Sequence, residues 1–354
     1  MYPNILGSII ADIALIAGSS TLAFLIAMAL TPWFRRQLVK YRLGKQIRDN
    51  AISGEKSKLF STLHAKKSGT PTMGGLLVWG TILIVVLFSR YLSAQGVFAH
   101  SLLNRKETWI PIFTLVTCGL LGALDDYLNI RGFGKNKGLS AKFKLFWLIL
   151  FAGAGALWFY YKLGFSSVAL PFPGMSFEIG IWYIPLFIFV IIATANSVNF
   201  TDGLDGLASG LLILAFTSFG ILAFTKGLLI LAAFCGVTVG ALLAFLWSNV
   251  PPAKFYLGDT GSLALGATLG VIAMLTDQTL ILPIVGIIFV VETLSVIIQL
   301  VAKKFFKRKV FLIAPIHHHF EQKGMAEFTI VMRLWIIGGI FAVFGTILGV
   351  LNII

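Results

Sequence analysis

The stretch that decides the fold is residues 207–248, LASGLLILAFTSFGILAFTKGLLILAAFCGVTVGALLAFLWS, in which Lys226 is the single charged residue. A helix needs about 20 consecutive apolar residues to cross the hydrocarbon core of a bilayer. The stretch therefore predicts two membrane-spanning helices, at 207–225 and 228–248, joined by a short turn at Lys226 and Gly227. A chain that contains such a pair is expected to be an integral membrane protein.

The rest of the chain repeats this pattern. Eight further apolar segments are expected to span the membrane, at 12–33, 72–93, 108–125, 143–162, 181–199, 261–276, 280–302 and 330–352. The segment at 280–302 contains Pro283, Gly286 and Glu292, so we expect that helix to be bent or broken. The sequence thus predicts an all-α, polytopic membrane protein with about ten transmembrane helices, organised as a single integral membrane domain over 1–354.

The composition agrees with a membrane protein and excludes several other classes. The chain is 58% hydrophobic and 12% charged, whereas soluble proteins carry about 25% charged residues. Its net charge of +14 indicates anionic lipid headgroups as the partner, and no nucleic acid. Cys118 and Cys235 both lie in apolar runs, where they are expected to be small core residues rather than a disulfide framework.

The basic residues predict the orientation. Ten Lys and Arg residues lie in loop 34–71, five in 126–144, one in 249–260 and six in 303–329, which makes 22 of the 28 in alternate loops on one side. Cytoplasmic loops carry the excess of Lys and Arg, so this side is expected to face the cytoplasm and both termini to be external, on the periplasmic side.

Acidic residues and histidines gather on the same side, which the positive-inside rule does not require. Nine of the 14 acidic residues and four of the five histidines lie there. A cytoplasmic active site would explain this asymmetry. The loops expected to form it are 34–71, 125–144, 196–206, 249–260 and 303–329.

Adjacent carboxylates end one predicted span. Asp125 and Asp126 stand in LDDY, where two negative charges at a membrane boundary are costly unless a cation pairs with them. One reading is a solvated helix end. The other is a Mg²⁺ or phosphate-chemistry site, because carboxylate oxygens suit Mg²⁺ and one carboxylate can act as a base.

Two further aspartate motifs lie beside apolar spans, one directly after the span at 181–199 and one directly before the span at 261–276. In NFTDGLDGLA, Asp202 and Asp205 are three apart, so a helix start there would place them on one face, beside Asn199. The glycines would allow a close backbone approach to a ligand, although a plain helix cap with a tight turn is the alternative. In FYLGDTGS, Asp259 is either a helix cap or a metal ligand, and Tyr256 could stack on a flat ring.

Histidines and lysines complete the candidate set. His317, His318 and His319 are consecutive, in a segment expected to be extended or a loop, and could bind a transition metal, contact phosphates or be solvated. Lys66 and Lys67 precede a Gly-Thr-Pro-Thr turn, but the chain contains no G-x-x-x-x-G-K-[ST] phosphate loop. Each loop lysine, taken singly, is better explained as an anionic-lipid contact. Together, these groups indicate a Mg²⁺-dependent diphosphate or phosphate-ester site at a bilayer surface, with a lipid phosphate as one substrate.

The same motifs resemble a known family. The chain is similar to the polyprenyl-phosphate N-acetylhexosamine-1-phosphate transferases over nearly its whole length. The motifs are GTPTMGG at 69–75, LDDY at 124–127, NFTDGLDGLA at 199–208, GDTGSLALG at 258–266 and PIHHHFE at 315–321. GTPTMGG and PIHHHFE resemble the branch that handles muramoyl-pentapeptide donors.

The resemblance implies a function. It implies a multi-pass enzyme of the bacterial inner (plasma) membrane, a homodimer with Mg²⁺ as cofactor and membrane lipids around it. The implied reaction transfers phospho-MurNAc-pentapeptide from UDP-MurNAc-pentapeptide to undecaprenyl phosphate, forming lipid I and UMP in peptidoglycan biosynthesis.

The resemblance also implies roles for individual residues. Asp259 would be the Mg²⁺ ligand and a catalytic residue, while Asp125 and Asp126 would deprotonate or position the lipid phosphate, and His318 would act at the phosphates. The substrate-binding residues would be Lys67, Thr72, Lys142, Asn199, Asp202, Asp205, Asn249, Tyr256, His317 and His319. This chain has Tyr256 where the family often has Phe, and Asn129 where it often has Lys.

Alternatives remain at this point. A secondary transporter would also carry polar groups among many spans, but usually near the bilayer midplane. The second alternative is a relative that uses a UDP-GlcNAc donor, and the third is a non-catalytic membrane scaffold. The enzyme hypothesis leaves two mechanisms. The acceptor phosphate attacks the donor directly with Asp125 as base, or an aspartate attacks the donor first and forms a covalent intermediate. Clustered carboxylates around a metal favour direct attack.

Overall fold

The computed structural model describes residues 2–44, 69–97, 101–104, 107–133 and 138–353, and they are mostly helical. The α-helices are α1 (Tyr2–Lys40), α3 (Gly75–Ala94), α4 (Trp109–Arg131), α5 (Ala141–Trp158), α6 (Tyr183–Thr201), α7 (Leu207–Thr225), α8 (Leu229–Asn249), α9 (Asp259–Leu275), α10 (Leu282–Val285), α11 (Ile287–Phe306), α12 (Ile316–Gln322) and α13 (Glu327–Ile353). A π-helix (Phe159–Leu163), a 3-10 turn (Gly180–Trp182) and an antiparallel hairpin of β1 (Ser167–Ala169) and β2 (Ser176–Glu178) lie between α5 and α6.

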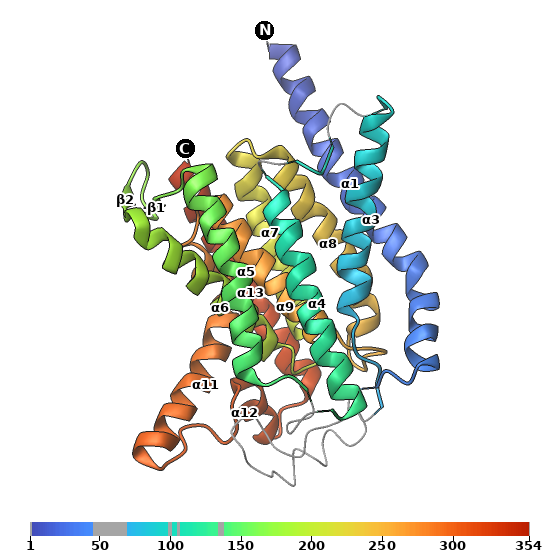
Figure 1. Cartoon of the computed structure of the whole chain (residues 1–354), viewed down its shortest axis with the longest axis vertical. Helices are drawn as coiled ribbons and strands as arrows, with labels where there is room; N and C mark the ends of the chain where they lie inside the picture. The colour runs from blue at the N-terminus through green and yellow to red at the C-terminus, as the bar shows by residue number, and fades with distance from the viewer. Residues whose placement is uncertain (1, 45–68, 98–100, 105–106, 134–137, 354) are drawn as a thin grey trace.

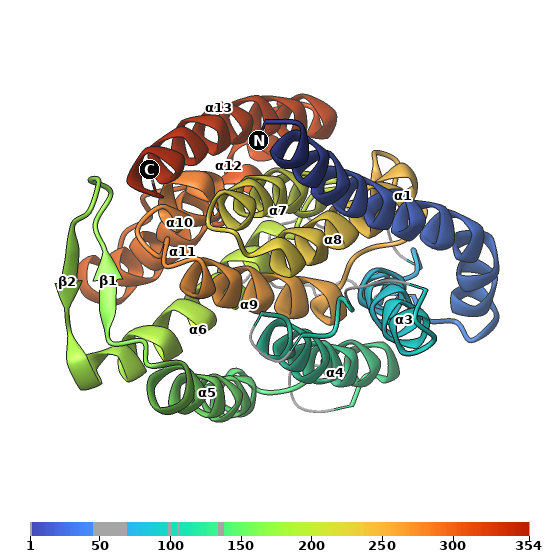
Figure 2. The ribbon, with the colours of Figure 1, turned by 90° about the horizontal axis from the view of Figure 1, so that it is seen from above.

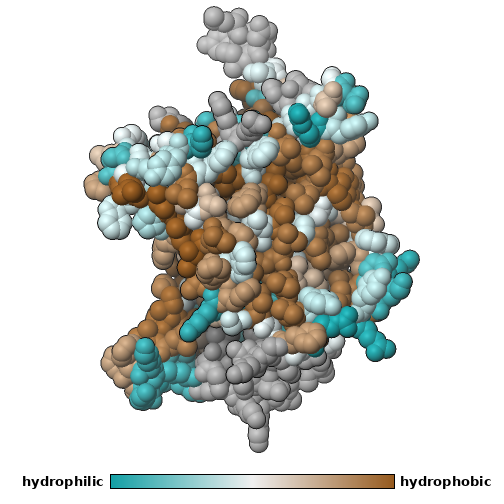
Figure 3. Space-filling view, viewed as in Figure 1, coloured by the Kyte–Doolittle hydropathy of each residue, from teal (hydrophilic) through white to brown (hydrophobic). Residues whose placement is uncertain are grey.

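Eight helical segments in the described residues are long and apolar enough to cross a membrane. They are Gly7–Lys40, Gly75–Ala94, Trp109–Arg131, Ala141–Leu163, Gly180–Thr201, Leu207–Thr225, Leu229–Asn249 and Glu327–Ile353. Figure 3 shows hydrophobic side chains over the middle of the visible face, with hydrophilic ones gathered toward its two ends. The chain is therefore a multi-pass membrane protein, as the sequence predicts.

Two of the ten expected spans are not among these eight. The segment expected at 261–276 is α9, whose 17 residues would extend about 25 Å. The segment expected at 280–302 is divided into α10 and α11, which meet at Gly286. α11 also carries Glu292 and two lysines of its last turn, Lys303 and Lys304, within its apolar sequence.

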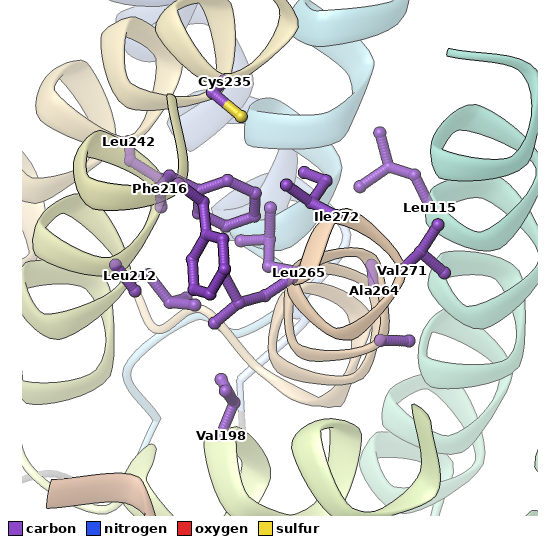
Figure 4. Close-up of a cluster of buried hydrophobic side chains, with 14 of the residues drawn as sticks. Leu115, Val198, Leu212, Phe216, Cys235, Leu242, Ala264, Leu265, Val271 and Ile272 are labelled. Carbon is purple, nitrogen blue, oxygen red and sulfur yellow. The ribbon is translucent and has the colours of Figure 1, made fainter. Parts of the chain in front are cut away.

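The short helix α9 forms the centre of the bundle. Every residue from Thr260 to Leu275 is buried, so its side chains meet protein rather than lipid and the helix need not match the bilayer thickness. The helices α3, α4, α6 and α7 pack against it. Seen from above, α9 lies in the middle of the bundle (Figure 2). Figure 4 shows its leucine and isoleucine side chains packed with Phe216 of α7 and Leu115 of α4.

The two ends of the bundle differ. Both termini lie at one end, and α12 lies at the other (Figure 1). The β-hairpin lies at the end with the termini, where Asp277 Oδ1 accepts a hydrogen bond of 3.2 Å from the backbone of Ala169. Burial raises the pKa of Asp277, although the nearby ammonium of Lys226 opposes this shift. Polar groups of the candidate site lie at the α12 end.

Candidate active site

Asp259 is the first residue of the central helix α9. A carboxylate is favourable there because the first turn of a helix carries positive partial charge. Its Oδ1 accepts a hydrogen bond of 2.9 Å from Asn199 Nδ2, and its Oδ2 lies 3.0 Å from Lys144 Nζ. Gly122 allows α4 to approach closely, because a side chain at that position would collide with the Asp259 carbonyl. The burial of α9 thus places one carboxylate where helices from three parts of the chain can reach it.

Asp125 shares the same ammonium group. Lys144 Nζ lies 3.2 Å from Asp125 Oδ2, and Asp125 Oδ1 accepts a hydrogen bond of 2.6 Å from the Leu139 backbone. Asp125 is 3% exposed and lies within α4, which continues to Arg131. The alternative of a solvated helix end is therefore wrong, and one lysine is placed between two carboxylates.

Asp126 is the next residue of α4 and anchors the start of α9. Its Oδ2 accepts hydrogen bonds from the backbone and the hydroxyl of Thr260, at 3.0 and 2.6 Å. Gly258 has φ 73° and ψ 174°, a conformation that is essentially restricted to glycine. A Cβ there would collide with the Asp126 carboxylate and lie 2.6 Å from the Thr72 hydroxyl. Thr72 is buried, and its hydroxyl has no hydrogen-bond partner in the described residues.

Asp202 and Asp205 lie in the turn between α6 and α7, not on a helix start, so they do not share a helical face as expected. Asp202 Oδ2 accepts a hydrogen bond of 3.1 Å from the Gly258 backbone. Asp205 Oδ2 accepts one of 2.9 Å from the Ala253 backbone, and its own N–H donates to Glu327 of α13. The turn therefore supports the loop that leads into α9.

Asn249 completes this support. Its Oδ1 accepts from the Gly206 backbone and from Ser209, and its Nδ2 donates to the Phe255 carbonyl. Its side chain is buried, so the amide links the two loops. Tyr256 is half-buried, and its backbone pairs with the segment that carries Thr72, through Pro71 and Gly74.

The three histidines lie on the short helix α12, not in an extended segment, so they point in different directions. His317 Nδ1 lies 3.0 Å from Glu292 Oε2 of α11, and its Nε2 faces Gly203 in the turn between α6 and α7. His318 Nδ1 lies 2.6 Å from Glu321, whereas His319 Nδ1 accepts from the Leu312 backbone at 3.1 Å. Burial and the nearby Lys323 lower the pKa of His319. His317 and His318 thus reach the aspartate turn, and His319 holds the preceding loop.

Two predicted lysines have different outcomes. Lys67 lies outside the described residues. Lys142 is exposed at the start of α5, two residues before the half-buried Lys144. Residues two apart on a helix face nearly opposite directions, which explains why one lysine reaches the carboxylates while the other is exposed.

Sequence reasoning missed three residues that bond the predicted ones. Lys144 carried a signal only as one of several loop lysines. Glu292 was noted as a reason for a broken helix, although an acid within an apolar span is itself a functional signal. Glu327 stands in the first turn of α13 and has no sequence mark that links it to Asp205.

The donors around Asp259 fit a hard divalent cation. Asp259 and Asp125 supply carboxylate oxygens, the ligands that Mg²⁺ prefers, and both already converge on one cationic group. No group of three or more His, Cys, Asp and Glu side chains in the described part of the chain could enclose a metal by itself. Mg²⁺ usually keeps several waters and binds through one or two carboxylates plus substrate phosphates, so an open site of this kind suits it.

Known proteins with similar sequences identify the family of this chain. Residues 108–277, which include Asp125, Lys144 and Asp259, match the family model described as glycosyl transferase family 4. This part of the multi-pass membrane protein is thus similar to the glycosyl transferase family 4 enzymes.

Similar proteins narrow this class. A phospho-N-acetylmuramoyl-pentapeptide-transferase of Geobacillus sp. (strain WCH70) is 39% identical over 327 residues, which cover 92% of this chain and 94% of the relative. That of Oceanobacillus iheyensis is 41% identical over 329 residues, which cover 91% and 94%. The chain belongs to the phospho-N-acetylmuramoyl-pentapeptide-transferase family, which confirms the resemblance drawn from its motifs.

Proposed function

We propose that this enzyme transfers phospho-MurNAc-pentapeptide from UDP-MurNAc-pentapeptide to undecaprenyl phosphate, producing lipid I and UMP for peptidoglycan synthesis. The observation that carries the proposal is the convergence of Asp125, Asp259 and Lys144 at the α12 end of a membrane-spanning bundle. Alternating acidic and basic groups suit a reaction between two phosphates. Their place at the end of the spans suits one soluble and one lipid-bound substrate.

Mg²⁺ is the proposed cofactor, with Asp259 as its main ligand. Bound there, it would neutralise the diphosphate of the donor and polarise the phosphorus under attack. Lys144 holds the two carboxylates together and adds a second positive charge beside the phosphates. Thr72 and the histidines His317 and His318 supply polar groups for the donor, with Tyr256 beneath the uracil.

Direct attack by the acceptor is the proposed chemistry. Asp125 accepts the proton of the lipid phosphate, whose oxygen then bonds to the phosphorus that carries the sugar. The bond from that phosphorus to UMP breaks, and UMP leaves with the electron pair. Asp126 is already bonded to Thr260, so its proposed role is to seat α9 and thereby position Asp259.

The proposed location is the bacterial inner membrane, with the site facing the cytoplasm, where the UDP-linked donor is made. Basic residues at the α12 end, among them Lys303 and Lys304 in the last turn of α11, support this orientation. A homodimer surrounded by membrane lipids is the proposed assembly.

Purified protein tests the proposal when it is incubated with Mg²⁺, undecaprenyl phosphate and UDP-MurNAc-pentapeptide, with UMP release as the measurement. We expect release that depends on both the lipid and Mg²⁺, and none from a parallel reaction with UDP-GlcNAc. Equal release from UDP-GlcNAc would reassign the donor. No release from either donor would exclude this function.

A further inference from the structure

Glu292 is a buried acid that has no role in the proposed mechanism. It lies on α11 in an otherwise apolar sequence and is 0% exposed. Its Oε2 lies 3.0 Å from Nδ1 of His317, which is also 0% exposed. Burying a carboxylate away from water is costly, so its presence at this position indicates a role for the pair.

The far side of each group has no partner in the described residues. Neither Glu292 Oε1 nor His317 Nε2 makes a hydrogen bond there, although both atoms are buried. His317 Nε2 faces Gly203, where a Cβ would collide with it. Gly203 adjoins Asp202, which bonds the Gly258 backbone directly before Asp259. The unpaired nitrogen is thus directed at the turn that supports the central helix.

We propose that Glu292 is a positioning residue: its carboxylate accepts from Nδ1–H and balances the charge of a doubly protonated His317 ring, so that Nε2–H donates to a phosphate oxygen of the donor at the turn between α6 and α7. This inference rests on the proposed function for the identity of the donor. A carboxylate bonded to Nδ1 fixes both the orientation of an imidazole and the nitrogen that remains free. The donor oxygen would supply the partner that Nε2 lacks.

Other ionisable groups surround His317 without replacing Glu292. The ring of His318 lies 4.1 Å away between centroids and is bonded to Glu321. Asp202 and Asp205 lie in the facing turn, and Glu327 of α13 bonds the Asp205 backbone. Glu292 contacts the His317 ring directly, at 3.0 Å from Nδ1.

Gln299 on the same helix provides a matched control. It is also buried, but its Oε1 accepts from the backbones of Val310 and Phe311, and its Nε2 donates to the Phe311 carbonyl. It therefore holds the loop before α12 without contacting His317. The variant Gln299→Met therefore shows what is lost when α11 no longer holds this loop but His317 keeps its contact with Glu292.

A double-mutant cycle tests the proposal. Glu292→Gln is nearly isosteric, and its amide oxygen can still accept a hydrogen bond from Nδ1 of His317, so it is suited to folding normally. UDP binding is measured by titration calorimetry, and turnover is measured with UDP-MurNAc-pentapeptide. The proteins compared are the wild type, Glu292→Gln, His317→Ala and the double variant. The control Gln299→Met is made both in the wild type and in His317→Ala. We expect Glu292→Gln to weaken UDP binding about tenfold in the wild type and less than about twofold in His317→Ala. The loss from Gln299→Met should be the same in both backgrounds.

A loss below about twofold in the wild type, or an equal loss in both backgrounds, would overturn the inference. A wild type that binds no UDP would overturn it as well. If the wild type binds UDP but does not turn over the donor, only the proposed reaction is contradicted. The double-mutant cycle on UDP binding then still decides the role of Glu292.

Discussion

The ammonium group of Lys144 lies between the carboxylates of Asp125 and Asp259, at 3.2 and 3.0 Å. Two partly buried carboxylates that face each other would repel without it. The lysine is 23% exposed, so solvent reaches this point and a substrate phosphate can approach. A single side chain thus both assembles the acidic pair and offers charge to an anionic substrate.

Replacement of Lys144 by Met should therefore lower turnover by about a hundredfold, because it removes charge stabilisation at the reacting phosphates. The matched control is Lys162→Met, at the opposite end of the same apolar segment Ala141–Leu163. UMP release at equal protein concentration is the measurement. Equal activities of the two variants would mean that Lys144 serves only as a surface charge.

At the scale of elements, the start of α9 depends on the backbone of Gly258. Gly258→Ala should destabilise the protein by about 1–3 kcal/mol, since its conformation is nearly restricted to glycine. It should also lower activity, because the new methyl group presses on Asp126 and Thr72. Gly153→Ala in α5 is the control, as its Cβ meets nothing within 4 Å. Thermal unfolding and UMP release measure both effects; a variant that matches the control would refute this account of the α9 start.

The contact between α12 and the loop before it should weaken in acid. His319 Nδ1 accepts a hydrogen bond from Leu312, so protonation breaks that contact. The pKa of His319 is lowered from its ordinary value of 6.5, so the unfolded chain takes up the proton first and stability falls as pH decreases below that value.

His319→Asn keeps an acceptor but does not titrate, so the variant should lose less stability than the wild type between pH 7.5 and 5.5. Melting temperatures of both proteins across this range provide the measurement. Parallel curves for the two proteins would show that His319 does not contribute to acid sensitivity.

At the scale of the whole molecule, long apolar runs were sufficient to predict the membrane class, and eight of the expected spans correspond to candidate spans in the structure. The central, protein-covered position of α9 was harder to predict, because a segment buried by protein on all sides has the same apolar sequence as one that faces lipid. The aspartates were identifiable from their motifs, but their partners were not. Lys144 reaches Asp259 across 115 positions, and no local pattern encodes a contact of that range.

Orientation is testable on the whole protein. Cys118 and Cys235 are buried, so a single introduced cysteine should dominate labelling. We expect Lys323→Cys, beside α12, to react from the cytoplasmic face and Gly174→Cys, in the hairpin turn, to react from the external face, as the basic loops require. Labelling is measured with a membrane-impermeant maleimide on sealed right-side-out and inside-out vesicles. Labelling of both positions from one face would contradict the topology.

The whole account depends on a reaction centre built around Asp259, at the end of the buried helix. The most direct test compares UMP release by the wild type and by Asp259→Asn, with Asp277→Asn at the opposite end of the bundle as the control. We predict that Asp259→Asn inserts and melts like the wild type yet releases no UMP above background, while the control remains active. Near-normal UMP release by Asp259→Asn would contradict the account.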